Sequence, residues 1–112
     1  MPATVKSEID HFSEVYCGHG VDARILARWL SDVDGYIAKE VLHLEHPPAE
    51  YSLAEAPDTP LLVYEPPHRR IYFLYLSAMT DFVSKQYNDY ANGIGAYNRA
   101  LSDYVHSVLA KK

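Results

Sequence analysis

Aromatic residues recur at helical spacing through the last third of this chain, and they constrain its fold more than any other feature. A polar break rich in Asn, Asp and Gly, near residues 88–95, interrupts the pattern. The spacing therefore predicts two helices that fold back on each other as a hairpin. The aromatic positions are Tyr72, Tyr75, Phe82, Tyr87, Tyr90, Tyr97 and Tyr104.

The tyrosine content is high for a small apolar interior. The chain has ten tyrosines in 112 residues, and each buried ring must also find a hydrogen-bond partner for its hydroxyl group. Rings that are half polar are useful on surfaces that meet other proteins. We therefore expect part of the tyrosine set to serve protein contacts.

Length and composition indicate one soluble globular domain over residues 1–112. A chain of this size buries roughly two-thirds of the surface that its unfolded form exposes. Hydrophobic residues make up 48% of the sequence and charged residues 22%, a balance that argues against disorder. The net charge of -5 argues against nucleic-acid binding as the main task, since such binding needs clustered cations.

The sequence shows neither a signal peptide nor a membrane span. The first six residues lack an apolar segment, and no stretch approaches the roughly 20 apolar residues that a transmembrane helix requires. We expect the protein to be made and kept in the cytoplasm, with no membrane partner. Cys17 is the only cysteine, so an internal disulfide is excluded and an inert thiol is expected.

The hydrophobic pattern predicts an all-α fold with four helices. The first covers about residues 7–15, and the second begins after Asp22 as its N-cap and continues to about residue 44, before Pro47 and Pro48. The third begins near Pro67 and extends to about residue 89, and Asn92 caps the fourth. The expected core between the second and third helices contains Trp29, Leu30, Ile37, Leu74, Ala78 and Phe82.

A long proline-bounded loop separates the second and third helices. Five prolines between positions 47 and 66 exclude a continuous helix, and residues 61–64 suit a short strand or an extended apolar strip. A loop of about 20 residues is long for a compact domain, and such loops are often functional. We expect this loop to make few contacts with its own core and to lie against a neighbour through Tyr51, Leu61, Leu62, Val63 and Tyr64.

A metal site is the alternative function that the sequence suggests. Glu40 and His43, like Asp103 and His106, stand three residues apart, a spacing that helix-bundle di-iron centres use twice. Such a bundle also needs carboxylates from two further helices, and the first helix is too short for a symmetric bundle. Zinc ligation by His43 and His46 with Cys17 and His19 lacks the usual paired cysteines. We therefore favour ordinary solvated helix faces at these positions.

No other pattern in the sequence indicates catalysis or a cofactor. A Gly-x-Ser-x-Gly segment is absent, and Gly93-x-Gly95 lacks the preceding strand and third glycine of a dinucleotide loop. We therefore expect neither a catalytic residue nor a cofactor, and no enzymatic activity. The cations of His68, Arg69 and Arg70 oppose the helix dipole at the start of the third helix, which indicates either a solvated cluster or an acidic partner.

Three segments together resemble the small head-tail connector proteins of tailed bacteriophages, the head-completion or adaptor family. Residues 27–37, ARWLSDVDGYI, resemble the family pattern W-L-x-x-L-D-G-x-I. Residues 61–76 are similar to its pattern L-L-V-x-x-P-Y-x-x-I-Y-x-x-Y-L, and residues 87–98 to F-x-x-Y-N-N-x-x-x-x-F-N. The chain departs from these patterns at Pro67, Lys85, Gln86 and Ala91, and it lacks the terminal Tyr-x-Arg-x-His.

The resemblance implies a structural, non-enzymatic subunit of the virion neck, made in the host cytoplasm. Such subunits form a homo-oligomeric ring beneath the portal protein, extend the channel through which DNA passes without sequence-specific binding, and meet a downstream neck or tail-completion protein. The resemblance also implies that the carboxyl-terminal helix reaches toward the portal. On that basis Val105, Val108 and Leu109 are expected to form part of the partner surface.

Overall fold

The computed structural model describes residues 4–16, 18–45, 50–63, 65 and 68–111, and within these residues the fold is all-α. Helices α1 (Val5–Val15) and α2 (Ala23–Tyr36) are followed by α3 (Arg70–Val83) and α4 (Tyr87–Ala110). A π-helical turn, η1 (Ile37–Val41), continues α2 directly. A long segment separates Val41 from Arg70, as the sequence predicted. The only β-pairing among the described residues is an isolated antiparallel bridge between Thr4 and Pro60. A strand was considered for residues 61–64, but residues 61–63 do not form one, and Tyr64 lies outside the described residues.

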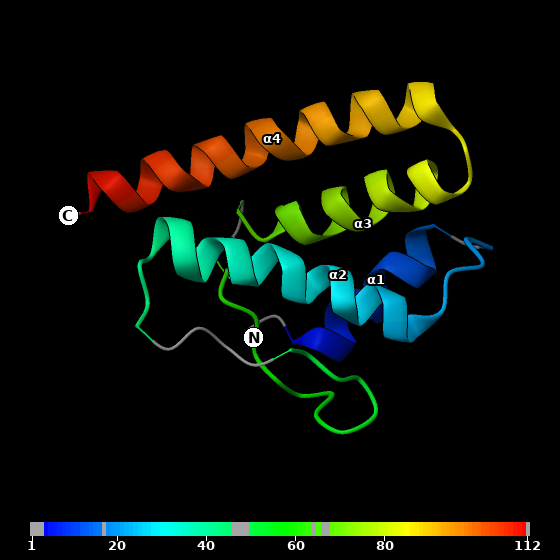
Figure 1. The fold of residues 1–112 in the computed structure, drawn as a ribbon, viewed down its shortest axis with the longest axis horizontal. Coiled ribbons are helices and arrows are strands. Elements are labelled where there is room, and N and C mark those ends of the chain that lie inside the picture. Colours follow the sequence, from blue (N-terminus) through cyan, green and yellow to red (C-terminus); the bar gives the residue numbers. More distant parts are fainter. Residues whose placement is uncertain (1–3, 17, 46–49, 64, 66–67, 112) are drawn as a thin grey trace.

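Helices α3 and α4 form the predicted hairpin and lie antiparallel along one side of the molecule (Figure 1). The position of the break was predicted wrongly. α3 ends at Val83, and the chain turns through residues 84–86, where Lys85 has a left-handed φ of 63°. α4 then continues unbroken for 24 residues and includes Asn92, Gly93 and Gly95.

Gly93 is part of a close helix contact and does not break the helix. A Cβ atom at Gly93 would lie 3.2 Å from the Cβ of Ala78 in α3, whereas a Cβ at Gly95 would meet only the Arg99 side chain, at 3.6 Å. A residue without a side chain therefore allows the two backbones to approach each other. Packing between helices, which local propensity does not report, decides this position.

The first two helices start as their capping residues dictate. Thr4 and Ser7 form a capping box at the start of α1, and the Asp22 carboxylate accepts a hydrogen bond of 2.8 Å from the backbone N–H of Arg24, as predicted for the start of α2. The second helix ends earlier than predicted, because its last turn widens to the π form and stops at Val41. His43 lies beyond the helix with a φ of 53°. Pro47, Pro48 and Pro67, which were expected to set helix ends, lie outside the described residues, as does Cys17.

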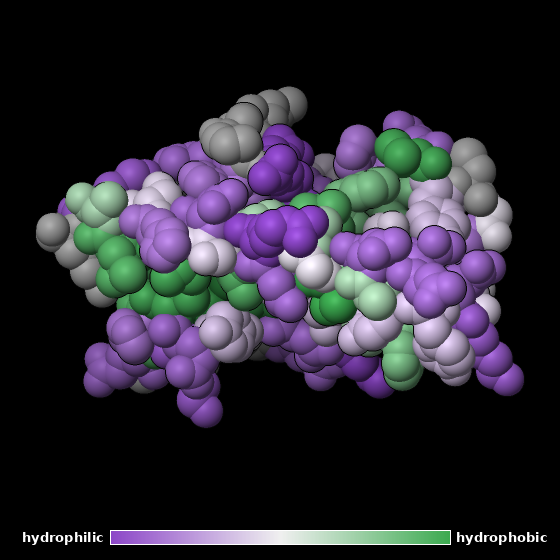
Figure 2. All heavy atoms as spheres, turned by 90° about the horizontal axis from the view of Figure 1, so that it is seen from above, coloured by the Kyte–Doolittle hydropathy of each residue, from purple (hydrophilic) through white to green (hydrophobic). Residues whose placement is uncertain are grey.

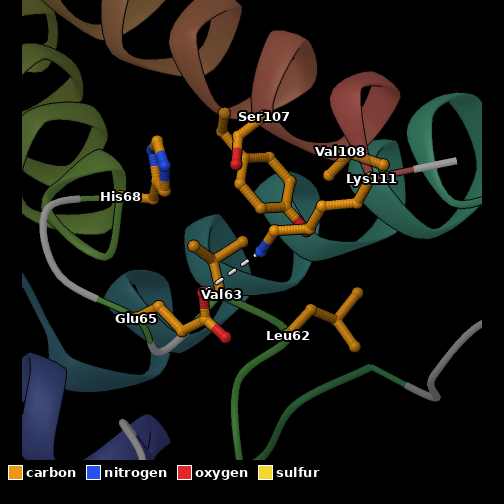
Figure 3. A pocket seen from close by; sticks show the side chains of 8 residues that line it. Leu62, Val63, Glu65, His68, Ser107, Val108 and Lys111 are labelled. Atoms are coloured by element: carbon orange, nitrogen blue, oxygen red, sulfur yellow. Dashed lines mark ion pairs between the residues drawn. The ribbon is translucent and has the colours of Figure 1, made fainter.

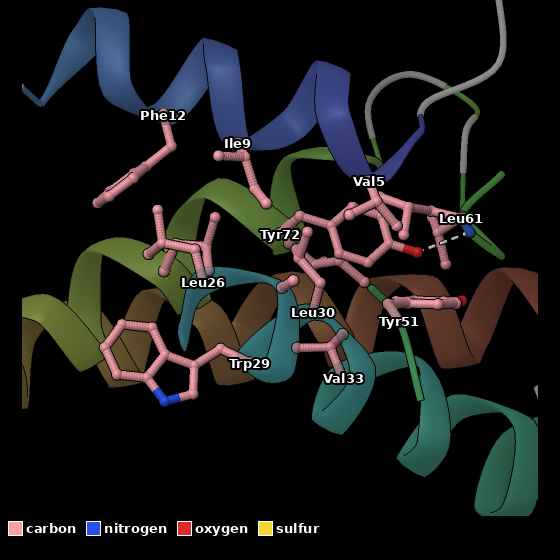
Figure 4. Close-up of a cluster of buried hydrophobic side chains, with 14 of the residues drawn as sticks. Val5, Ile9, Phe12, Leu26, Trp29, Leu30, Val33, Tyr51, Leu61 and Tyr72 are labelled. Atoms are coloured by element: carbon pink, nitrogen blue, oxygen red, sulfur yellow. Dashed lines mark hydrogen bonds between the residues drawn. The ribbon is translucent and has the colours of Figure 1, made fainter. Parts of the chain in front are cut away.

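The core lies where α1, α2 and α3 meet (Figure 4). Trp29, Leu30, Ile37 and Ala78 are buried as predicted, and Leu74 packs against this core from its edge. Phe82 was placed in the core wrongly, since 46% of its surface is exposed. Its ring instead contacts Tyr87 and Tyr90 across the hairpin turn, at centroid distances of 6.0 and 5.0 Å.

The loop before α3 is part of this core, contrary to expectation. Tyr51, Leu61 and Val63 are buried, with at most 7% of their surface exposed. The loop carbonyl groups of Pro57 and Thr59 also accept hydrogen bonds of 3.0 Å from the first N–H groups of α1. The first turn of a helix has N–H groups without partners inside the helix, and this loop supplies acceptors for two of them.

The surface over α4 is mainly hydrophilic, and hydrophobic side chains reach it in separate patches (Figure 2). Among the described residues, no helix combines the length and the apolar character that crossing a membrane would need. The exposed apolar positions are dispersed over several elements, including Val15, Ile25, Tyr36, Val83, Tyr87 and Leu109.

The contact at Gly93 predicts that Gly93→Val destabilises the protein by ~1–3 kcal/mol, because a branched side chain would push α3 and α4 apart. Gly95→Val is the matched control. It adds the same side chain to the same helix where a Cβ would make only an ordinary contact with the Arg99 side chain, and valine has a better helix propensity than glycine. Chemical denaturation of both variants checks this, and equal stabilities would show that α3 and α4 do not approach closely at Gly93.

Candidate functional site

A buried carboxylate joins α2, the loop and α3. Asp34 has no exposed surface, although a charged group in the interior costs several kcal/mol unless it is well hydrogen-bonded. Its carboxylate accepts hydrogen bonds from the hydroxyl groups of Tyr51, at 2.5 Å, and Tyr72, at 2.6 Å. The backbone N–H of Leu62 donates a third, at 3.0 Å. The donors thus come from both ends of the loop and from α3.

Two further bonds extend this network along the loop. The Tyr51 N–H donates to the Ser31 hydroxyl at 2.6 Å, and the Val63 N–H donates to the Tyr72 hydroxyl at 2.8 Å. Burial raises the pKa of Asp34, while the bonds from Tyr51, Tyr72 and Leu62 act against that rise. Burial and the nearby Asp34 carboxylate raise the pKa of both tyrosines, so both hydroxyls stay protonated as donors.

The loop fixed in this way forms one wall of a groove beside the end of α4 (Figure 3). The groove has a volume of about 160 Å³. Leu62 and Val63 line it from the loop side, and Tyr104 and Val108 from α4. The ammonium group of Lys111 lies 3.6 Å from the Glu65 carboxylate across its mouth. We call this site the α4–loop groove.

The structure brings together part of the predicted partner surface. Leu62, Val63 and Val108 all line the α4–loop groove. Val105 is half-buried on α4, and Leu109, the residue after Val108, is 56% exposed; neither lines the groove. Tyr51 and Leu61 belong to the interior of the monomer, so their side chains are not offered to a partner. Tyr64 lies outside the described residues.

The sequence did not identify Glu65, His68, Tyr104, Ser107 and Lys111 as members of this groove. The groove forms only because the loop returns to α4, which local patterns do not reveal. The His68 ring packs edge-on against the Tyr104 ring at a centroid distance of 5.7 Å. A histidine in the turn before α3 and a tyrosine on α4 carry no sequence signal of such a contact.

The basic cluster at the start of α3 has acidic partners inside the molecule. Arg69 donates a hydrogen bond of 2.8 Å to the carboxylate of Glu8, which is only 4% exposed on α1. Arg70 lies 4.0 Å from Asp103 on the exposed surface of α4. An external acidic partner is therefore not needed to explain these cations, and Arg69 connects α1 to α3.

The residues of the alternative metal site are not assembled into a site. Glu40, His43, Asp103 and His106 are all exposed, and His43 has left the helix that was to align it with Glu40. In the part of the chain that the structure describes, no group of three or more His, Cys, Asp or Glu side chains could hold a metal ion. The di-iron geometry therefore has no support at these four positions.

Comparisons with protein families, with curated proteins and with solved structures each gave no match for this chain.

Tyr72→Phe should lower the free energy of unfolding by ~1–3 kcal/mol, because it removes one donor to Asp34 and leaves the buried Val63 N–H without its acceptor. Tyr87→Phe, which removes a hydroxyl from a ring that is 57% exposed, should stay within about 0.5 kcal/mol of the original protein. Denaturant titration followed by circular dichroism measures both. If the two variants lose equal stability, Asp34 does not depend on the Tyr72 hydroxyl.

Proposed function

We propose that this protein is a structural adaptor of the tailed-bacteriophage neck, a subunit of a ring that binds beneath the portal and joins head to tail. The observation that carries this proposal is the resemblance of three separate segments to head-tail connector proteins. Asp34 of the first segment accepts hydrogen bonds from Leu62 and Tyr72 of the second. Two segments that resemble one family thus make direct contact with each other, which supports a common fold.

The surface properties suit such a subunit. The α4–loop groove combines apolar walls with polar groups at its mouth, a composition common in protein interfaces. A net charge of -5 offers few cations to DNA phosphates, so DNA would pass along the channel without being held. The ring would place this protein in the virion neck after synthesis in the host cytoplasm. We assign it no enzymatic role, and its partners would be further copies of itself, the portal protein and a downstream neck or tail-completion protein.

Cryo-electron microscopy of the purified protein mixed with the portal protein of the same virus tests the proposal. We expect class averages with an additional ring of density on one end of the portal, coaxial with its channel. The portal alone is the control. A mixture in which the portal carries no added ring, although the small protein is folded by circular dichroism, would overturn the proposed function.

The double variant Val108→Asp with Leu109→Asp should abolish portal binding and retain helicity, because two carboxylates would be placed in and beside the α4–loop groove. A groove contact depends on a few apolar anchors. His106→Asp with Ala110→Asp is the matched control, since it adds the same two carboxylates to the last turns of α4 at exposed positions. Cosedimentation with the portal measures binding. Persistent binding of the first variant would place the portal contact elsewhere.

A further inference from the structure

A second pocket lies between α2, α3 and α4, apart from the α4–loop groove. Its volume is about 350 Å³, more than twice that of the groove. α2 contributes Asp32 and Tyr36, α3 contributes Tyr75, and α4 contributes Tyr97 and Asn98. We call it the tyrosine pocket. It combines three aromatic rings with one carboxylate and one amide.

The hydroxyl groups of the three tyrosines of this pocket take no part in the hydrogen-bond network around Asp34, although the Tyr97 ring is only 7% exposed and belongs to the core. The Tyr75 and Tyr97 rings contact each other at a centroid distance of 5.0 Å and an angle of 55°, and Tyr36 is 51% exposed at the rim. Unlike Tyr51 and Tyr72, none of the three donates its hydroxyl proton to another described residue. Aromatic faces around an open pocket attract cations through the negative charge above each ring.

The negative charge of the pocket comes from the Asp32 carboxylate. Within the described part of the chain, no Lys, Arg or His lies within ion-pair distance of Asp32. The nearest candidate on the same helix, Arg28, lies 3.3 Å from Glu50 instead. Burial and the neighbouring Glu50 raise the pKa of Asp32, and Arg28 offsets only part of this rise. A cation delivered from outside would therefore relieve the repulsion between two carboxylates.

We propose that the tyrosine pocket binds an arginine side chain presented by a basic polypeptide partner. The guanidinium group is planar, so it can stack on a tyrosine ring while its N–H groups donate to the Asp32 carboxylate and the Asn98 carbonyl oxygen. The ammonium group of lysine has neither a flat face for stacking nor paired N–H groups in one plane. The net charge of -5 favours a partner of positive charge. This site does not depend on the proposed role in the phage neck.

A titration followed by NMR tests this site with three short probes. The probes are acetyl-Gly-Arg-Gly-amide, the same peptide with lysine, and the same peptide with citrulline, which has the shape of arginine without its charge. We expect saturable shifts of the Tyr36, Tyr75 and Tyr97 ring signals with the arginine peptide, and binding at least ~10-fold weaker with citrulline, a difference of about 1.4 kcal/mol. Equal binding of arginine and citrulline, or no saturable shift, would overturn the proposal.

Variants then locate the binding. Asp32→Asn should weaken binding of the arginine peptide by ~5-fold or more, since it removes the charge of the acceptor. Asp58→Asn, an equally exposed change in the loop, should leave the affinity within about twofold. Both positions are exposed, so we expect both variants to fold. The dispersion of the amide signals in the NMR spectrum checks this. Equal affinities of the two variants would overturn the assignment.

Two further outcomes would also contradict the proposal. If the lysine peptide binds as tightly as the arginine peptide, the pocket recognises charge alone and not the guanidinium plane. If the protein forms a dimer in sedimentation experiments and Asp32→Asn abolishes it, the occupant is a second copy of this chain. A monomer that prefers arginine over both other peptides supports the proposal.

Discussion

The fold of this protein depends on one buried carboxylate. An ion in the interior is tolerated only when its hydrogen-bond capacity is met, and Asp34 meets it with donors that lie 17 to 38 residues further along the chain. The donors can converge only if the loop returns to α2 and α3 packs beside it. The requirement of a single side chain therefore fixes a long segment whose described residues form neither a helix nor a strand.

Helix α2 carries a second carboxylate, Asp32, whose surroundings differ from those of Asp34. Residues two positions apart on a helix do not face the same side, so Asp34 points into the core while Asp32 lies at the rim of the tyrosine pocket. The interior supplies donors for Asp34, whereas no Lys, Arg or His among the described residues lies within ion-pair distance of Asp32. α4 has a similar double role, because Tyr97 lines the tyrosine pocket and Val108, three turns later, lines the α4–loop groove.

The sequence predicted the helices and their hairpin well, because hydrophobic spacing and capping residues are local signals. It misplaced features that distant contacts decide. The segment Asn92-Gly93-Ile94-Gly95 has the composition of a helix break. It lies within α4 all the same, and Gly93 packs closely against Ala78 of α3. The loop was expected to face a partner, although its apolar residues cover the core. One signal was available: Asp34 stands four residues after Leu30 and three before Ile37, on an otherwise apolar stripe, and such a position calls for buried donors, which tyrosines can supply.

This arrangement separates the residues that define the fold from those that would select a partner. Within the segment WLSDVDGYI, the positions that match the connector pattern include Trp29, Leu30, Asp34 and Ile37, and all of these are buried. Asp32 and Tyr36 fall at positions that the pattern leaves unspecified, and both line the tyrosine pocket. A resemblance carried by interior residues argues for a shared fold. Partner choice would then lie with side chains such as Asp32 and Tyr36, which can change without disturbing the hydrogen bonds around Asp34.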